Sequence, residues 1–206
     1  MIRYRKRENT GGEIFVTKTL YLVRHGQTYF NYYHKVQGRC DSPLNEKGIR
    51  QVEMARDYFQ KHHTHFDKAF SSTQERACDT LEIITDHKMP YTRLKDLREK
   101  CYGIFEGRDE FLLPWNYGNS NVDPTMEKNE DVVARMRRAV VEIMDGIDDG
   151  ETALVCGHGD ILARYVRDAT DNPNFPGFAN ASIVKLTVDG DKVHFDEYVW
   201  PAEDLG

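Results

Sequence analysis

Two apolar runs that each end beside a histidine constrain the fold of this chain most. Leu20–Val23 leads through Arg24 to His25, and Thr152–Cys156 leads through a glycine to His158. In open α/β folds, ligands bind at the carboxyl ends of parallel strands, where the chain turns into a helix. Two histidines placed in this way can meet in one pocket, although they lie far apart in the sequence. Because arginine presents a donor fork suited to phosphate oxygens, Arg24 beside His25 predicts a phosphate site with a histidine nucleophile.

The remaining segments alternate between strand-like and helix-like patterns. We expect strands at 19–24, 66–70, 91–94 and 151–156, helices at 46–62, 74–86 and 127–144, and helical structure over 161–167. Ser71–Thr73 is predicted to cap the second helix. Asp189-Gly190 is typical of a tight turn and is predicted to join strands at 182–188 and 192–200 as a hairpin. This order predicts an α/β fold, a three-layer α/β/α sandwich with a mostly parallel mixed sheet.

The length of 206 residues accommodates one domain with a substantial core, and residues 17–206 are predicted to form it. Residues 1–16 differ in character from the rest and are predicted to be an N-terminal extension. Either this extension is a flexible tail, or native translation begins at Val16 and the preceding residues do not belong to the native protein. Its basic opening is followed by polar and acidic residues, which does not fit a secretion signal.

Residues 108–128 interrupt the alternation, because large apolar residues are mixed with turn formers and show no clean period. Long irregular insertions in compact domains are often lids or binding loops. We therefore expect a cap insertion beside the active site, with Trp115 and Tyr117 as candidate substrate contacts. The alternative is that this segment packs on the surface of its own domain without a role in binding.

Charge and composition argue against several function classes. The net charge of −6 and the pI near 5.8 do not suit nucleic acid or an anionic membrane surface as a partner. No apolar stretch approaches the roughly 18 residues that a membrane span needs. The four cysteines are scattered, without the spacing of a metal site, and are typical of free thiols in a reducing, cytoplasmic location. The edge strand of the expected hairpin is able to pair between subunits, so a homodimer is one expected assembly.

Five blocks of residues follow one another along the chain in a recognisable pattern. They are Leu22–Thr28 with Asn31; Gln37, Gly38, Asp41, Pro43, Leu44 and Gly48; Ser71, Ser72, Arg76, Ala77 and Thr80; Leu97, Glu99, Tyr102, Gly103, Glu106 and Gly107; and Gly157–Gly159. In this order and with these spacings, the blocks resemble the histidine phosphatase superfamily, the phosphoglycerate mutase-like enzymes. The resemblance covers nearly the whole chain from Leu20 onward and implies the phosphoglycerate mutase-like form of the sandwich.

The resemblance and the chemistry of the residues together imply roles for these positions. His25 is expected to attack phosphorus and carry the phosphoryl group, with its tautomer fixed by a hydrogen bond to the other ring nitrogen. Arg24 and Arg76 are expected to clamp the phosphate, and His158 to stabilise the transferring phosphoryl group. Glu99 is the expected general acid and base, a role that requires a raised pKa.

Four further residues complete the predicted site. Asn31 and Gln37 are expected to donate hydrogen bonds to phosphate, and Gly159 to allow close approach of the backbone. Ser71 is a candidate for orienting His25. No metal or other cofactor is expected, because the arginines and histidines supply the positive field that Mg²⁺ supplies in many phosphoryl-transfer enzymes.

These features predict a metal-independent hydrolase of small-molecule phosphomonoesters that works through a phosphohistidine. Two alternatives stay open, a cofactor-dependent phosphoglycerate mutase and a non-catalytic module that binds a phospho-ligand. The resemblance implies that a mutase carries paired arginines and lysines in a longer insertion, whereas residues 108–128 have Arg108 and Lys128 only at their ends. The centre of this segment favours hydrolysis, because it is aromatic, apolar and acidic: Phe111, Leu112, Leu113, Trp115, Tyr117 and Asp123.

Overall fold

A six-stranded mixed sheet forms the centre of the protein, in a computed structural model that describes residues 17–118 and 123–205. Its strands are β1 (Lys18–Arg24), β2 (Lys68–Ser72), β3 (Thr92–Leu94), β4 (Thr152–Gly157), β5 (Ile183–Asp189) and β6 (Lys192–Val199). The strand order is β3-β2-β4-β1-β5-β6, in which the first four strands are parallel and the last two run antiparallel to their neighbours. The expected mixed α/β sheet is confirmed.

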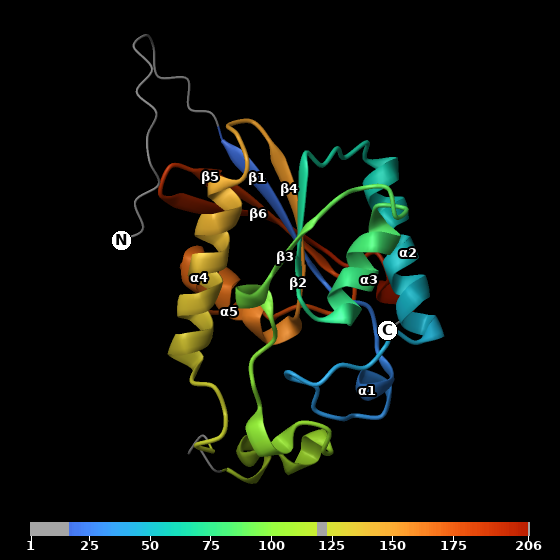
Figure 1. Cartoon of the computed structure of the whole chain (residues 1–206), viewed down its shortest axis with the longest axis vertical. Helices are drawn as coiled ribbons and strands as arrows, with labels where there is room; N and C mark the ends of the chain where they lie inside the picture. The colour runs from blue at the N-terminus through green and yellow to red at the C-terminus, as the bar shows by residue number, and fades with distance from the viewer. Residues whose placement is uncertain (1–16, 119–122, 206) are drawn as a thin grey trace.

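Helices cover both faces of this sheet. Figure 1 shows α2 (Glu46–Lys61) and α3 (Glu75–Ile84) against one face, and α4 (Asn129–Asp145) and α5 (Gly159–Ala169) against the other. The side chains of β1 alternate between two cores, with Leu22 packed among residues of α4 and α5 and Val23 among those of α2 and α3. This alternation explains why a continuous apolar run predicted a strand buried on both faces. Within the described ranges, no helix is long and apolar enough to cross a membrane.

The second strand lies later than expected, and it takes in Ser71 and Ser72. Both serines are completely buried, and Ser71 is paired with Cys156 of β4. The prediction that Ser71–Thr73 caps α3 is therefore wrong in part. Gln74 is the N-cap residue, and the Ser72 hydroxyl accepts from its amide at 3.2 Å. Small hydroxyl side chains suit a cap and also fit inside a packed strand, so the local pattern did not separate the two.

The two ends of the chain differ in what the structure describes. The C-terminal hairpin is confirmed, with Gly190 in the left-handed region (φ 55°) between β5 and β6. Because β6 is an edge strand of the sheet, pairing between two subunits along it stays a prediction. The N-terminal extension predicted at 1–16, with Val16, lies outside the described residues.

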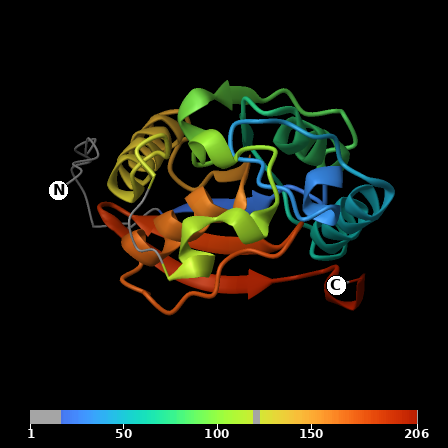
Figure 2. The same ribbon diagram turned by 90° about the horizontal axis from the view of Figure 1, so that it is seen from below.

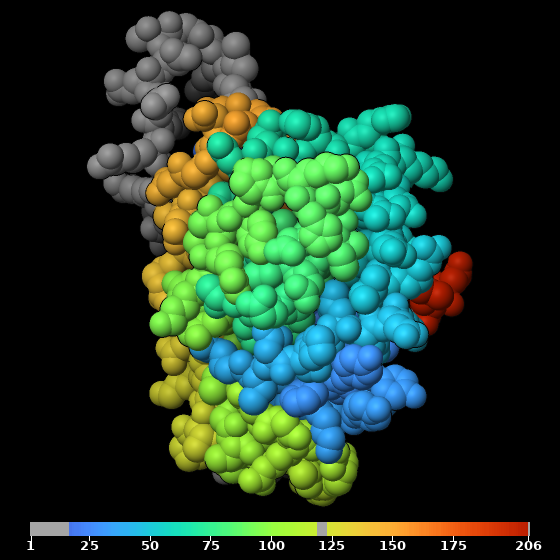
Figure 3. Space-filling model, turned by 45° about the vertical axis from the view of Figure 1, so that its right-hand side comes forward, coloured from blue at the N-terminus to red at the C-terminus, as the bar shows by residue number. Residues whose placement is uncertain are grey.

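The segment predicted to be a cap lies at the carboxyl ends of the parallel strands, beside α1 (Tyr29–Tyr32), at the lower end of Figure 1. It contains the short 3-10 helices η3 (Glu110–Leu112) and η4 (Pro114–Tyr117), and Figure 2 shows it crossing in front of the sheet. Backbone hydrogen bonds join it to the stretch after α1, from Val36 N to Arg108 O (2.9 Å) and from Glu110 N to His34 O (2.8 Å). The two stretches form one continuous surface in Figure 3.

Candidate active site

His25 follows β1 directly, at the carboxyl edge of the parallel strands. Its backbone amide donates to Gly157 O at the end of β4 (3.0 Å), which brings the two histidine-bearing turns side by side. The turn also packs against the start of α2, where a Cβ on Gly26 would lie 2.5 Å from Gly48 O. Glycine is required there, because no side chain fits into that gap. His25 is buried as a result and held in one place.

The hydrogen bonds of His25 fix its tautomer. Nδ1 lies 2.7 Å from Gly26 O, and because a carbonyl only accepts, Nδ1 carries the proton. Nε2 therefore holds the lone pair and accepts from Arg76 Nε at 3.3 Å. Ser71 does not orient His25 as predicted, since its hydroxyl donates to Cys78 Sγ at 3.7 Å. The Gly26 carbonyl orients the ring instead, and a backbone carbonyl leaves no signal in the sequence.

Arg76, in the first turn of α3, is completely buried. Its Nη1 donates to Cys40 O (2.9 Å) and to Asp41 Oδ1 (2.8 Å), and its Nη2 donates to Gly38 O (3.0 Å). Together with the bond from Nε to His25, four of the five N–H groups are committed to the protein, which leaves one at Nη2. The guanidinium is rigidly placed, and it lines the same cavity as His25.

Arg24, the last residue of β1, reaches the cavity from the neighbouring side. Its Nη1 donates to Phe178 O at 2.7 Å, while its Nε has no hydrogen-bond partner in the described part of the chain. Burial lowers the pKa of the Arg24 guanidinium, and the charge of Glu99 opposes that shift. Gly159 leaves room for this arginine, because a Cβ there would lie 3.2 Å from Arg24 Nε. Gly159 also lines the cavity, and the close approach of its backbone to phosphate stays a prediction.

His158 precedes α5 and is completely buried, with its ring centroid 5.3 Å from that of His25. It lies behind the residues that line the cavity. Neither of its ring nitrogens has a hydrogen-bond partner among the described residues. Buried polar groups are nearly always hydrogen-bonded, so an imidazole left in this state is available to a ligand beside His25.

Glu99 follows η1 (Lys95–Leu97) and places its carboxylate at the N-terminus of α5. Oε1 accepts from the Lys100 and Ile161 amides (2.8 and 3.1 Å), and Oε2 accepts from the Asp160 amide (3.1 Å). Burial raises the pKa of the Glu99 carboxyl, the charge of Asp160 raises it further, and the backbone amides oppose both effects. The net shift is upward, which suits a group that must hold a proton near neutral pH.

The two buried histidines make the stability of the fold depend on pH. Burial lowers the pKa of His25 and of His158 well below the ordinary value of 6.5, and the charge of Arg76 adds to this effect. In the unfolded chain both histidines take up a proton below about pH 6.5, whereas in the fold they stay neutral. The unfolded state then binds more protons, so stability falls as the pH drops, by up to about 1.4 kcal/mol per pH unit for each histidine.

Denaturant unfolding between pH 7.5 and pH 5 measures this slope. His158→Gln is expected to reduce the slope of the free energy of unfolding against pH by the contribution of one buried histidine. His194→Gln, at an exposed position of β6, is expected to leave this slope unchanged. Glu99 acts in the opposite direction, because an acid with a raised pKa stabilises the fold as the pH falls through that pKa. A slope that does not change in His158→Gln would contradict the burial of a neutral imidazole at this position.

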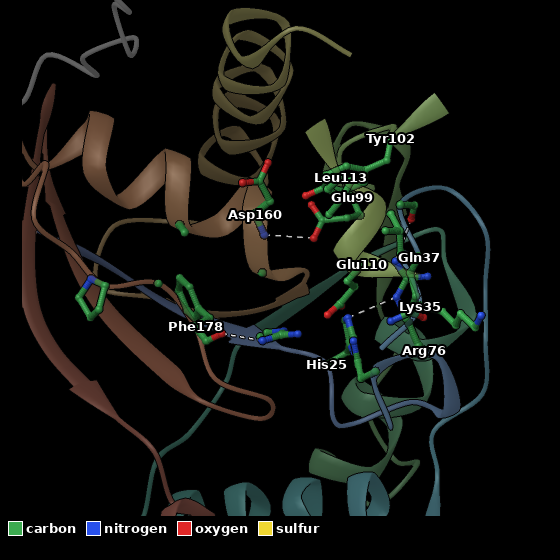
Figure 4. A pocket seen from close by; sticks show the side chains of 18 of the residues that line it. His25, Lys35, Gln37, Arg76, Glu99, Tyr102, Glu110, Leu113, Asp160 and Phe178 are labelled. Carbon is green, nitrogen blue, oxygen red and sulfur yellow. Dashed lines mark hydrogen bonds between the residues drawn. The ribbon is translucent and has the colours of Figure 1, made fainter. Parts of the chain in front are cut away.

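One cavity of about 360 Å³ is lined by Arg24, His25, Arg76 and Glu99, but not by His158. Figure 4 shows His25 and Arg76 at one side of it, with Glu99 facing them from the other. Asn31 and Gln37 also line it, and their hydrogen bonds to phosphate stay a prediction. The Oδ1 atom of Asn31 accepts from the backbone of the turn before α1 (3.2 Å), and Gln37 Oε1 is buried without a partner in the described residues. No group of three histidine, cysteine or carboxylate side chains within 17–118 and 123–205 is arranged to hold a metal ion.

The structure does not place Trp115 or Tyr117 in the cavity, contrary to the prediction. Their exposed fractions are 50% and 65%, and the Trp115 ring packs near that of Tyr102, with a centroid distance of 6.3 Å. Glu110 and Leu113 of the same segment line the cavity instead. The direction of each side chain depends on the two short 3-10 helices, and an aperiodic sequence does not predict those.

Sequence reasoning also missed residues that complete the walls. Tyr102 belongs to the fourth of the five sequence blocks, so the sequence did contain a signal for its place in the site. Burial raises the pKa of its hydroxyl well above the ordinary value. Lys35 comes from the stretch after α1, and Arg167 from the last turn of α5. Phe178 lies in the loop before β5 and holds Arg24 through its carbonyl oxygen. That loop has no motif, and only the folded chain brings it to the site.

Gln74 connects the two halves of the site through its side-chain amide. Its Nε2 donates to Gly38 O (2.9 Å), the carbonyl that also accepts from Arg76, and its Oε1 accepts from the Glu99 backbone amide (2.8 Å). The side chain is almost completely buried. This one amide therefore joins the loop that holds the buried arginine to the segment that carries the buried carboxylate.

Replacing Gln74 with methionine, which has a similar length, is expected to lower the free energy of unfolding by about 1–3 kcal/mol. The physical reason is that the Glu99 amide loses its buried acceptor and Gly38 O loses a donor. Chemical denaturation measures the change. Gln51→Met is the matched control, because this equally buried glutamine makes one bond to a backbone amide, from Gln27 N at 3.0 Å. A loss no larger than that of the control would contradict the connecting role of Gln74.

Comparisons with known proteins agree on one family. A family model described as the histidine phosphatase superfamily (branch 1) matches residues 20–201. A 2,3-bisphosphoglycerate-dependent phosphoglycerate mutase of Bradyrhizobium sp. is 32% identical, over 72% of this chain and 79% of its own length. A protein of Bacillus subtilis named uncharacterized phosphatase PhoE is 27% identical, over 89% of this chain and 91% of its own. The crystal structure of phosphoglycerate mutase from Bacillus anthracis superposes with a TM-score of 0.80 at 26% identity, over 88% of this chain and 92% of that chain.

Proposed function

Because the chain belongs to the histidine phosphatase superfamily, we propose that it hydrolyses phosphomonoesters through a phosphohistidine on His25. The observation that carries the proposal is the state of the His25 ring. Its Nδ1–H is bound to the Gly26 carbonyl, so the lone pair of Nε2 lies beside the Arg76 guanidinium at the cavity. A neutral, oriented imidazole nitrogen next to fixed positive charge is suited to attack phosphorus.

In the first step, the hydrogen bond from Arg76 Nε to His25 Nε2 is exchanged for one to a phosphoryl oxygen. The freed lone pair of Nε2 forms a bond to phosphorus as the bond between phosphorus and the ester oxygen breaks. The leaving oxygen takes a proton from the Glu99 carboxyl and departs as an alcohol. The free N–H of Arg76, the Nε of Arg24 and an unpaired ring nitrogen of His158 are the donors proposed for the phosphoryl oxygens. Asn31 and Gln37 are proposed to add side-chain amide donors from the loop beside them.

In the second step, water attacks the phosphohistidine. The Glu99 carboxylate accepts a proton from this water, the bond between nitrogen and phosphorus breaks, and its electron pair returns to His25 Nε2. Inorganic phosphate and the starting tautomer of His25 are the products. Arg24 and Arg76 supply the positive charge for both steps, so the proposal includes no metal ion or other cofactor.

Hydrolysis is proposed over mutase activity because of the segment that covers the site. A mutase must hold a second anionic group of its substrate while the phosphoryl group moves. The cap supplies Glu110 and Leu113 to the cavity rather than a cation. Mutase activity is the second candidate, since two of the three similar proteins described above carry that name, and a non-catalytic phospho-ligand module is the third.

Phosphate release from a panel of phosphomonoesters, in the presence of EDTA, tests the proposal. The panel includes 3-phosphoglycerate, with and without 2,3-bisphosphoglycerate. Release that resists EDTA supports the hydrolase. Conversion of 3-phosphoglycerate to its 2-isomer without release would make the protein a mutase. Binding of the panel without either reaction would favour the non-catalytic module.

A further inference from the structure

Glu110 is a carboxylate that the cap holds at the cavity. Its backbone amide donates to His34 O (2.8 Å), and its neighbour Asp109 forms a bridge and an ion pair with Lys35 (2.5 Å). These contacts fix the start of η3 against the stretch after α1. Figure 4 shows the Glu110 side chain pointing into the cavity, on the side of the proposed nucleophile.

The charge of Glu110 is not balanced by a lysine or an arginine within ion-pair distance in the described residues. The Glu110 Oε2 atom lies 3.7 Å from His34 Nδ1. The His34 side chain is 84% exposed, so this contact is weak. Of the other two acids of the cavity wall, Asp160 pairs with Arg164 at 2.7 Å, and Glu99 accepts from three backbone amides. Burial lowers the pKa of the Arg24 guanidinium, and the charge of Glu110, after that of Glu99, opposes this shift from across the cavity.

We propose that Glu110 determines substrate choice by repelling a second negative charge, so that the preferred phosphomonoesters have neutral or cationic leaving groups. This inference rests on the hydrolysis proposed above and names the substrate class of the same site. The proposal places the phosphate between Arg24 and Arg76 and the leaving group toward the cap, whose Glu110 and Leu113 line the same cavity. A carboxylate or second phosphate on that group meets the Glu110 carboxylate, whereas an ammonium group is attracted to it.

The rest of the wall is consistent with this choice. Val36, Leu113 and Phe178 offer apolar contact to an organic leaving group. The charge of Lys35 is already balanced by Asp109. Arg167 acts in the opposite sense to Glu110, since its Nε donates to Phe175 O and no carboxylate of the described residues pairs with it. Its influence must therefore be measured separately.

Two nearly isosteric substrates that differ by one charge test the proposal. Glycerol 3-phosphate has a neutral leaving group, and 3-phosphoglycerate has a carboxylate in the corresponding position. Glu110→Gln is expected to raise kcat/KM for 3-phosphoglycerate relative to glycerol 3-phosphate by about fivefold at low ionic strength. The gain is expected to shrink at roughly 0.5 M NaCl, because salt screens charges that are partly exposed. For ethanolamine phosphate, kcat/KM relative to glycerol 3-phosphate is expected to fall in Glu110→Gln, because its ammonium group loses the attraction of the carboxylate.

Asp123→Asn is the matched control, because it removes the same charge from a position of the same segment that does not line the cavity. It is expected to leave the substrate ratio within twofold of the wild type. A ratio that does not move in Glu110→Gln would overturn the proposal. So would a ratio that responds to Arg167→Gln and not to Glu110→Gln.

Failure of the proposed function gives a different result. If the wild-type protein releases phosphate from no substrate, hydrolysis is wrong. The two ligands are then compared by titration calorimetry on the wild-type protein and Glu110→Gln. The same relative gain in affinity for 3-phosphoglycerate would support the role of Glu110 in selection, and equal affinities in both proteins would overturn it.

Discussion

Replacing His25 with alanine is expected to lower kcat for phosphate release by about 10⁴-fold or more, because the reaction loses its nucleophile. Arg76 and Arg24 still bind phosphate in this variant, so KM is expected to change much less than kcat. The fold should tolerate the change, since the turn around His25 is held by backbone contacts to Gly157 and by the packing of Gly26 on Gly48. Steady-state kinetics together with a denaturation curve measure both effects.

The covalent intermediate offers a second readout for this variant. A phosphorylated histidine is labile in acid and stable in base, so rapid quenching into alkali should trap labelled protein from the wild type and not from His25→Ala. His194→Ala is the matched control, because this exposed histidine of β6 lies outside the cavity. Labelling that persists in His25→Ala would place the nucleophile elsewhere.

Replacing Glu99 with glutamine is expected to slow hydrolysis by about 10²–10³-fold for an alkyl ester such as glycerol 3-phosphate. With 4-nitrophenyl phosphate the loss should stay below about tenfold, because 4-nitrophenolate leaves without needing a proton. This dependence on the leaving group separates proton donation from a structural effect. The glutamine oxygen can still accept from the Lys100 and Ile161 amides, but its NH2 group faces the Asp160 amide and cannot accept from it, so a denaturation curve accompanies the kinetics.

The same variant is also expected to change the pH profile. The wild type should lose activity on alkyl esters as the pH rises through the raised pKa of Glu99, and this limb should disappear in Glu99→Gln. Asp96→Asn is the control, because Asp96 pairs with Arg138 at the surface (2.9 Å) and does not line the cavity. An equal loss for both leaving groups in Glu99→Gln would contradict the assignment of a general acid.

Several parts of the site follow from the sequence because they are local. Strands that end in Arg24 and in Gly157 bring their next residues to one edge whenever the strands are parallel neighbours, and β1 and β4 are such neighbours. The five sequence blocks identified the family, and the match of the family model to residues 20–201 confirms it. The hairpin at Gly190 was readable because its left-handed backbone suits glycine. Apolar periodicity placed most of the elements, with shifts of a few residues at their ends.

The tertiary structure alone decided which side chains of the aperiodic segment face the cavity. Trp115 and Tyr117 were expected there by their chemistry, but Glu110 and Leu113 occupy the wall, because the backbone contacts from the stretch after α1 set the direction of η3. It also decided that the Gly26 carbonyl, rather than Ser71, orients His25. Such features depend on contacts between distant segments and on backbone atoms that every residue shares, and neither leaves a trace in the order of the side chains.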